Sequence, residues 1–441
     1  MITKNEFHEI AGNIYKELNE GEDLAIGLDG EETTFMRFSK SRIRQLGDID
    51  QTSASLRLTF NERSLTSSFS LSGDIFQMEK TLKDELLGLR KEISSIEKDP
   101  HFTPIVGGQS SEEYLSGKLL DGEIASKTIL EPLRDVDGAG IYCSGKVIRA
   151  TSNSKDQSHW FENDSFYVDF SLYSDKQKAV KGGYAGREFV EKEYLEEIQN
   201  KKDLLQKVSH PSKKMEPGKY RVYLAPAAVA EILGTLSWQG FSHSALKKGM
   251  SPLKRFNEGE TLSEKVTINE DFSLGFSPRF NDDGEVSPEK LSLFKDGKLE
   301  NTLISTRTAK EYGVESNFSS SYEMPRSISL EAGTLHETEA LKTLDKGLFI
   351  SNLHYLNYSD LQNGRITGMT RFACFYVENG RIVAPIEDLR FDESFYHFFG
   401  KGLVDLTDNA NVFPVTDSYE QRSVGAMSTP GMIVNDFSFT L

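Results

Sequence analysis

The sequence predicts an α+β protein of two domains: an N-terminal α/β domain with antiparallel strands and flanking helices, and a C-terminal domain rich in strands. Three observations support this. The chain has 441 residues, enough for two domains that each bury a core. Apolar residues in the first half switch between helical and strand spacing. After residue 250, short apolar runs alternate with turn residues, which is typical of strands joined by hairpins.

In the first half, helices are expected where apolar residues recur every three or four positions, over residues 3–19, 76–96 and 187–206. Strands are expected over residues 23–75 and 139–184, where apolar and polar residues alternate between Gly, Asp and Asn turns. The segment "SSEEYLSG" is expected to form a short helix within an irregular stretch.

The best domain boundary is "VSHPSKKMEPGKY", because it combines two prolines, a glycine and a basic cluster between a helix and a strand. We therefore expect domains at residues 1–212 and 213–441. The second domain begins with the strand "KYRVYLA" and a helix that starts at Pro226, a favoured first helical residue. Asp-Gly and Asn-Gly pairs predict tight turns at residues 283–284, 296–297, 363–364 and 379–380.

The formal net charge is −17, which disfavours nucleic acid and anionic membranes as partners. Two cysteines, Cys143 and Cys374, in 441 residues do not form a secreted disulfide framework, and both lie in apolar runs typical of buried thiols. The first residues lack the apolar core of a signal peptide, and no segment has the ~20 apolar residues of a membrane span. These features predict a soluble, cytoplasmic protein.

No common catalytic motif stands out. There is no P-loop and no G-x-G-x-x-G opening a helix, and no two of the eight histidines have the spacing of a helical zinc site. "HEIAG" and "HETEA", at His8 and His336, lack the second histidine. Ser242, His243 and Ser244 are neighbours in sequence, but a serine hydrolase needs its serine and histidine in spatial contact and an orienting acid. The stretch "HYLNYSD" at 354–360 is either a peptide-binding groove or a strand of alternating exposure.

An ordered series of segments resembles the TldD/PmbA family: "PGKYRVYLAPAAVAEIL", "KKGMSPL", the turn of Asp282, Asp283 and Gly284 with the hairpin and helix after it, "GLFISNLHYLNYSDLQNGRITGMTRFACFYVENGRIVAPI", and the tail "STPGMIVNDFSF". In the first half, "GAGIYCSGKVIRATSNS" also resembles a family segment. The resemblance implies a TldD/PmbA-type C-terminal domain.

Catalytic members of that family carry H-E-x-x-x-H on the helix after the domain-entry strand, and a cysteine near the C-terminus. The corresponding positions here are Gly234, Thr235 and Gln239, and no cysteine follows Cys374. This pattern resembles the TldE/PmbA branch, whose members lack the metal. The resemblance therefore implies no metal or other cofactor, and a chain that is not catalytic alone.

The same resemblance implies a partner and a substrate. The partner is a TldD-like catalytic subunit, a second copy of this chain, or both, and the substrate is an unfolded peptide. Two alternatives remain open: a stand-alone homodimer that binds peptides without cleaving them, and a hydrolase with a nonstandard site. The residues predicted to line a peptide groove are His354, Tyr355, Tyr358, Thr367 and Arg371.

Overall fold

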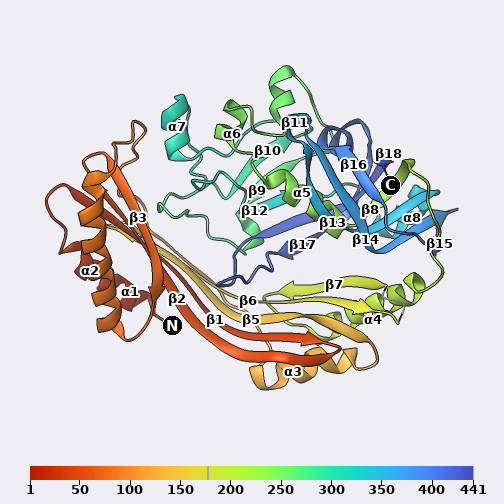
Figure 1. The fold of residues 1–441 in the computed structure, drawn as a ribbon, viewed down its shortest axis with the longest axis horizontal. Coiled ribbons are helices and arrows are strands. Elements are labelled where there is room, and N and C mark those ends of the chain that lie inside the picture. The colour runs from red at the N-terminus through yellow and green to blue at the C-terminus, as the bar shows by residue number, and fades with distance from the viewer. Residues whose placement is uncertain (176–177, 441) are drawn as a thin grey trace.

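The computed structural model describes residues 1–175 and 178–440 (Figure 1). The helices of the first half are α1 (Lys4–Tyr15), α2 (Ile75–Glu92), α3 (Gly122–Leu130) and α4 (Glu191–Val208). Its strands are β1 (Glu22–Ser39), β2 (Arg42–Phe60), β3 (Arg63–Leu71), β4 (Ser111–Leu115), β5 (Asp137–Asn153), β6 (Ser158–Tyr173) and β7 (Ala179–Gly186).

These strands form one seven-stranded sheet in the order β3-β2-β1-β5-β6-β4, with β7 also paired to β6. All its pairings are antiparallel except β4 with β6. Two-residue turns join β1 to β2 and β2 to β3. Their residues Lys40, Ser41, Asn61 and Glu62 all have φ between 50° and 61°, as turns matched to the strand twist require.

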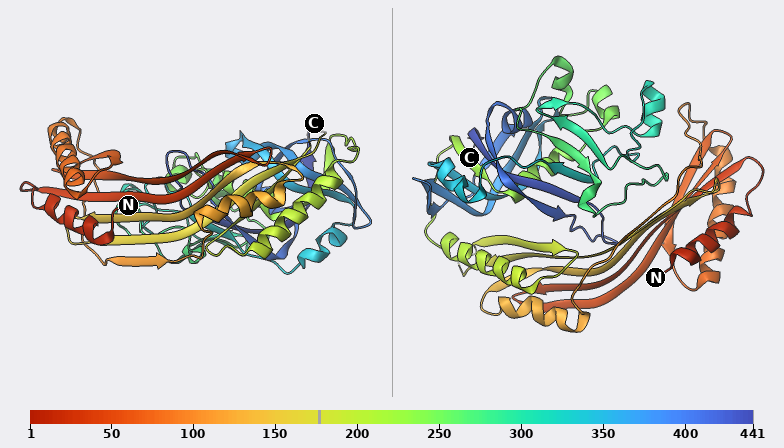
Figure 2. Two further views of the ribbon diagram at one scale, coloured as in Figure 1. Left: turned by 90° about the horizontal axis from the view of Figure 1, so that it is seen from below. Right: turned by 180° about the vertical axis from the view of Figure 1, so that it is seen from behind.

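The long sheet is covered at two places by different helices. At one end, α1 and α2 pack on β1, β2 and β5 around a cluster that includes Ile14, Leu56 and Leu86. Farther along, α3 and α4 pack on β5, β6 and β7 around Tyr142, Phe170 and Tyr194. Figure 2 shows the strands curving between the two groups of helices.

In the second half the helices are α5 (Pro226–Ser237), α6 (His243–Lys247), α7 (Thr306–Tyr312) and α8 (Ala340–Leu344). The strands are β8 (Gly218–Leu224), β9 (Ile268–Asp271), β10 (Lys290–Lys295), β11 (Lys298–Leu299), β12 (Ser327–Leu330), β13 (Gly347–Asp360), β14 (Arg365–Glu378), β15 (Arg381–Pro385), β16 (Arg390–Ser394), β17 (Leu403–Pro414) and β18 (Ala426–Phe439).

This second sheet is mixed and has eleven strands, with the main order β11-β10-β9-β12-β18-β16-β14-β13-β8. Strand β18 also pairs with β8 and β17, and β15 pairs with β14. The largest core of the molecule lies on this sheet and includes most of the apolar residues of α5. None of the helices described in the structure is both long and apolar enough to cross a bilayer.

The two halves meet along their length. Ala373 and Phe375 of β14 belong to the same buried cluster as Tyr194 of α4. The loop between β17 and β18 inserts Arg422 into the first sheet, where its guanidinium donates to Ser165 Oγ at 2.9 Å and to Gly145 O at 3.2 Å. Arg422 is only 5% exposed, so the loop is anchored by a buried charge.

The turn at Asp282–Gly284 also binds the first half. Gly284 O accepts hydrogen bonds from Gln157 Nε2 and His159 Nε2, both at 2.9 Å, and the His159 ring stacks on Phe280 with centroids 5.0 Å apart. This turn, singled out by its resemblance to a family motif, therefore contributes to the contact between the halves.

The predicted α+β class is confirmed, as are the strand runs, the helices at the start of the chain and after Pro226, and the hairpins closed at 296–297 and 379–380. The helix expected at "SSEEYLSG" is wrong, because residues 111–115 pair in parallel with β6, from Ser111 with His159 to Leu115 with Asn163. A short polar segment takes its structure from such a neighbour rather than from its own periodicity. The boundary between residues 212 and 213 stays a prediction.

Candidate functional site

Helix α5 is the element on which the resemblance places the zinc motif. It follows β8 directly and packs against β13 and β18. Nine of its twelve residues are buried. Gly234 and Thr235 lie within the helix, and Thr235 Oγ1 donates to Glu231 O at 2.9 Å. The Thr235 hydroxyl is therefore engaged by its own helix.

The third motif position does not lie on this helix. α5 ends at Ser237, and Gln239 follows in a left-handed conformation with φ 62°. Gly240 then passes so close to Leu236 that an added Cβ would come within 2.0 Å of Leu236 O. The backbone turns away at this point, so the Gln239 side chain is exposed and does not continue the helical face of Gly234 and Thr235.

Tyr358 closes the same helix end. Its hydroxyl donates to Thr235 O at 2.9 Å, which also accepts from Trp238 N at 3.1 Å, and to Trp238 O at 3.2 Å, just beyond the helix. Burial raises the pKa of Tyr358 well above its usual value. Tyr358 was predicted to line a peptide groove, and the structure places its hydroxyl in a structural contact.

The other predicted groove residues lie at the β13–β14 ladder but do not share one surface. Tyr355 is 74% exposed and its ring centroid is 4.0 Å from that of His354. Burial and the nearby positive charges of Arg371 and Lys181 lower the pKa of His354. Thr367 is separate, since its Oγ1 donates to Phe391 O of β16 at 2.8 Å. His354, Tyr355 and Arg371 thus remain as a partly exposed cationic and aromatic group.

Glu231 is a residue that the sequence reasoning missed. It is the acidic residue of α5, and although part of its side chain is exposed, desolvation of the carboxylate raises its pKa, against the effect of Lys181 and with that of Asp169. Lys181 and Asp169 belong to the first sheet and form an ion pair with each other. Glu231 therefore lies where α5 faces the first half. Its position in the sequence, one helical turn before Thr235, could have marked it as a candidate site residue.

Ser242 and His243 do not form a catalytic pair. Ser242 Oγ donates to Glu323 Oε2 at 2.6 Å, and His243 Nδ1 lies 2.9 Å from Thr302 Oγ1. Ser242 is the N-cap of α6, where its hydroxyl also accepts from Ala245 N at 3.0 Å. The serine thus supports a helix start.

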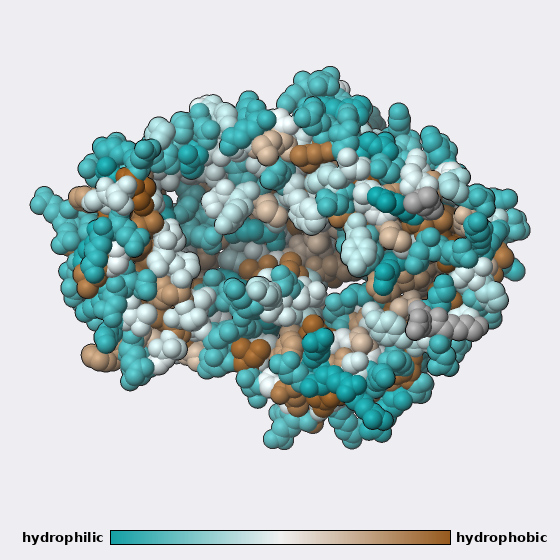
Figure 3. Space-filling model, viewed as in Figure 1, coloured by the Kyte–Doolittle hydropathy of each residue, from teal (hydrophilic) through white to brown (hydrophobic). Residues whose placement is uncertain are grey.

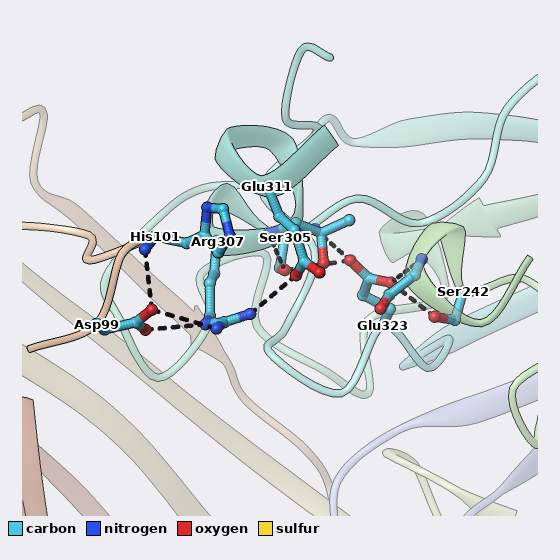
Figure 4. Close-up of polar contacts among 9 residues, drawn as sticks. Asp99, His101, Ser242, Ser305, Arg307, Glu311 and Glu323 are labelled. Carbon is cyan, nitrogen blue, oxygen red and sulfur yellow. Dashed lines mark hydrogen bonds and ion pairs between the residues drawn. The ribbon is translucent and has the colours of Figure 1, made fainter. Parts of the chain in front are cut away.

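Glu323 is the centre of a polar network that joins two helix starts (Figure 4). Besides Ser242, it accepts hydrogen bonds from Ser244 N at 3.0 Å, Ser305 N at 2.9 Å and Ser305 Oγ at 3.1 Å. Burial acts to raise the pKa of Glu323, but these hydrogen bonds outweigh it and the pKa is lowered. One carboxylate therefore holds the N-termini of α6 and α7 together.

The same helix α7 reaches the first half. Arg307 donates through Nε to Asp99 Oδ2 at 3.0 Å and through Nη1 to Glu311 at 3.0 Å (Figure 4). Asp99 is itself positioned by the backbone N–H of His101 at 2.9 Å. Loop 97–110 is thereby tied to the second half.

A large cleft lies between the lobe of α1, α2 and β3 and the loop that carries Arg422. Figure 3 shows the face of the molecule on which the two halves leave a hollow between them. The volume of the cleft is about 1360 Å³. It is lined by five acidic residues and by apolar ones; the acids are Glu6, Asp29, Asp50, Asp74 and Glu420, and the apolar residues include Ile75, Phe76 and Met78. This cleft could not be predicted from the sequence, because its walls come from segments far apart in the chain.

A model of the PmbA/TldA metallopeptidase C-terminal domain matches residues 217–441, just over half of the chain. The chain belongs to the PmbA/TldA family. This is the TldD/PmbA family indicated by the sequence motifs, and its matched region begins at the β8 strand that leads into α5.

Solved structures share the fold over the whole chain. TldE from Thermococcus kodakarensis has a TM-score of 0.76 at 14% identity, covering 99% of this chain and 100% of its own. Proposed modulators of DNA gyrase from Thermotoga maritima and Bacteroides thetaiotaomicron have TM-scores of 0.74 and 0.78 at 15% and 16% identity, covering 99% and 100% of this chain and all of their own. No curated protein matches the chain in sequence.

The side chains around α5 in this PmbA/TldA protein do not fit a zinc ion. Within residues 1–175 and 178–440, no three His, Cys, Asp or Glu side chains lie close enough together to share a metal. Gly234 offers no ligand atom and Thr235 Oγ1 is already bonded to its helix. Cys143 and Cys374 are buried, and burial raises the pKa of each thiol to about 11, which disfavours the thiolate that zinc requires.

Proposed function

We propose that this chain is the TldE/PmbA-like, non-catalytic subunit of a TldD/TldE-type metallopeptidase complex that acts on unfolded peptides. The observation that carries the proposal is the altered motif on α5. Gly234 and Thr235 replace an imidazole and a carboxylate, and Gln239 lies beyond the end of the helix. We therefore expect a TldD-like partner to provide the zinc chemistry.

The chemistry of a zinc peptidase explains why these changes are decisive. Three protein ligands hold the ion and leave one position for a water molecule, whose pKa the metal lowers. Removing one ligand can leave weak binding, but here the two helical ligand positions and the carboxylate position have all changed. Glu231 is the acid nearest to them on α5, and it faces Lys181 and Asp169 rather than a histidine.

The proposed contribution of this chain is a binding surface for extended peptide. His354, Tyr355 and Arg371 offer an aromatic and cationic group beside the β13–β14 ladder. Sheet edges and such pockets hold extended peptides through main-chain hydrogen bonds with little regard for sequence. We assign this surface to the domain at residues 213–441, joined to a domain at residues 1–212, in a protein of the cytoplasm.

The test is a measurement of zinc content and peptide cleavage on the purified chain, alone and after mixing with a TldD-like protein. We expect less than stoichiometric zinc and no cleavage for the chain alone, and cleavage only in the mixture. The triple variant Gly234→His, Thr235→Glu, Gln239→His should also fail to bind zinc stoichiometrically, because position 239 lies off the helix. Stoichiometric zinc together with cleavage by the unmodified chain would overturn the proposal.

A second candidate function is peptide binding by the chain without a catalytic partner. The cleft favours it, since five acidic residues and exposed apolar side chains such as Phe76, which is 78% exposed, suit a basic, apolar segment. Titration calorimetry with an unfolded basic peptide distinguishes this function from that of a non-catalytic subunit, because it measures peptide binding by the chain alone. Binding that is lost in Asp74→Lys and unaffected by a TldD-like protein would support this function over the first.

A further inference from the structure

Strands β4 and β6 bring a serine and a histidine into direct contact. Their parallel pairing places Ser111 opposite His159, so that both side chains lie on the same face of the first sheet. Ser111 Oγ lies 2.7 Å from His159 Nδ1. His159 is 1% exposed, whereas Ser111 is an exposed residue. The histidine is thus held inside the protein, and its serine partner can be reached from solvent.

The second ring nitrogen of His159 decides which atom of the pair carries the proton. His159 Nε2 lies 2.9 Å from Gly284 O, and a carbonyl oxygen can only accept a hydrogen bond, so Nε2 carries a hydrogen. Burial lowers the pKa of His159, so the imidazole is neutral at pH 7 and carries one hydrogen. His159 Nδ1 is therefore an acceptor, and the Ser111 hydroxyl donates to it.

The carbonyl that orients His159 comes from the second half of the chain. Gly284 has φ 77°, a left-handed conformation that favours glycine, and its carbonyl oxygen also accepts from Gln157 Nε2 at 2.9 Å. The His159 ring stacks on Phe280, with centroids 5.0 Å apart. These contacts hold the imidazole toward Ser111. In serine hydrolases an acidic side chain orients the histidine, and here a backbone carbonyl does so.

A small cavity adjoins Ser111. Its volume is about 110 Å³. A water molecule takes up about 30 Å³ in the liquid, so the cavity accommodates about three or four groups of that size. Glu112 lines the cavity and forms an ion pair with Lys4 at 2.8 Å, so its charge is compensated. These properties suit a short, neutral acyl chain.

Two nitrogen atoms of the residues that line this cavity are unpaired. In the part of the chain that the structure describes, neither Trp160 Nε1 nor His8 Nε2 has a hydrogen-bond partner, and both atoms are buried. Trp160 is 2% exposed, and its indole N–H can only donate. Buried polar groups are almost always paired, so an unpaired donor at a cavity indicates a ligand. The carbonyl oxygen of a bound acyl group would provide the acceptor.

We propose that Ser111 and His159 form a catalytic dyad that hydrolyses esters of short, neutral carboxylic acids. Ser111 Oγ attacks the carbonyl carbon of the ester and gives its proton to His159 Nδ1, while the indole N–H of Trp160 donates to the oxyanion. The bond to the leaving alcohol then breaks, and the alcohol takes that proton. Water attacks the acyl-serine and gives a proton to Nδ1, and this proton returns to Ser111 Oγ as the carboxylic acid leaves.

This activity is independent of the proposed subunit role. It uses no residue of α5, no metal ion and no partner chain. The dyad depends instead on contact between the two halves, because Ser111 and His159 lie in the first sheet and Gly284 lies in the second half. Ester hydrolysis by the chain alone and peptide cleavage with a TldD-like protein can therefore succeed or fail separately.

The test combines two measurements on the purified full-length chain, with a metal chelator present. The first is the hydrolysis of p-nitrophenyl acetate, which should be saturable. The second is labelling with a fluorophosphonate probe, which should modify Ser111, as located by mass spectrometry of the digested protein. Ser111→Ala should abolish both the label and the saturable hydrolysis. His159→Gln should lower the rate about 100-fold or more, the contribution typical of a general base.

A matched control is Ser116→Ala, which removes the hydroxyl of another exposed serine just after β4 and should keep both the rate and the label. Circular dichroism verifies that each variant is folded. If His159→Gln does not fold, Ser111→Ala decides alone, because an exposed serine can lose its hydroxyl without loss of packing. Saturable hydrolysis that persists in Ser111→Ala overturns the proposal, and so does a label on another residue or no label at all.

Discussion

Replacing Glu323 by alanine should loosen two helices at once. α6 has five residues and α7 has seven, lengths at which an isolated helix is unstable in water. Both begin at residues whose backbone N–H groups, those of Ser244 and Ser305, donate to the same carboxylate. Without it, the buried N–H of Ser305 and the partly buried N–H of Ser244 each lose their acceptor.

The size of the effect follows from the number of contacts. A buried donor left without an acceptor costs about 1–3 kcal/mol, so two such donors should cost about 2–6 kcal/mol. Glu323→Gln keeps one carbonyl oxygen and turns an amide NH₂ toward the other pair of donors, so about half of that loss is expected.

The effect should also depend on pH in a defined direction. The folded-state pKa of Glu323 is lowered from its ordinary value. A group of this kind stabilises the fold above its unfolded pKa of about 4.3, and that contribution is lost as the pH falls through the folded pKa. The gap in stability between the unmodified chain and Glu323→Gln should therefore be widest above about pH 4.5 and narrow below it.

Hydrogen exchange followed by mass spectrometry measures the local stability of α6 and α7. A local measurement is needed because a chain with two sheets need not unfold in a single step. Segments 242–248 and 305–313 should exchange faster in Glu323→Ala, with an intermediate rate in Glu323→Gln. The control is Glu315→Gln, which neutralises an exposed carboxylate close by in the sequence. Unchanged protection of both segments in Glu323→Ala would refute the assignment of Glu323 as a shared cap.

Three further predictions concern other buried groups. Arg422→Leu should destabilise the contact between the halves by about 2–4 kcal/mol, seen as faster proteolysis of loop 415–425, because Ser165 and Gly145 lose their buried donor; resistance equal to that of the unmodified chain would contradict it. Glu270 is buried and its pKa is raised to about 7, so stability should fall as the pH rises from about 4.5 to 7, and Glu270→Gln should abolish that slope in denaturant titrations. Cys374, with a pKa raised to about 11, should resist a thiol reagent at pH 8 until the chain is denatured, and rapid modification of the native protein would contradict this.

Sequence analysis correctly predicted those helices, strands and turns that are determined by residues close together in the chain. Helical spacing indicated α1, α2 and α4, and strand alternation indicated the long ladder of β1 and β2. Pro226 marked the start of α5, and the Asn-Gly pair at 379–380 marked the turn between β14 and β15. In each case the residues that decide the structure are neighbours along the chain.

What the sequence did not predict depends on contacts between distant residues. Glu323 and Ser242 are 81 positions apart, and Arg422 and Ser165 are 257 apart. No periodicity connects such pairs. Tyr358 was read as a surface aromatic of a groove, but the fold brings its hydroxyl to the end of α5, 123 residues earlier in the chain. Gly240 was the one local sign that α5 ends before Gln239.

The packing of α5 explains why this helix does not need a metal ion for its stability. Nine of its twelve residues are buried, and their contacts are with apolar side chains of the second sheet. Burial of these side chains stabilises the helix whether or not it holds a metal, since apolar burial is the dominant favourable term in folding. If, as we propose, Gly234 and Thr235 stand where catalytic members carry an imidazole and a carboxylate, that replacement leaves the scaffold intact. The features of this chain that can act on other molecules are then its surfaces: the acidic cleft and the group of His354, Tyr355 and Arg371.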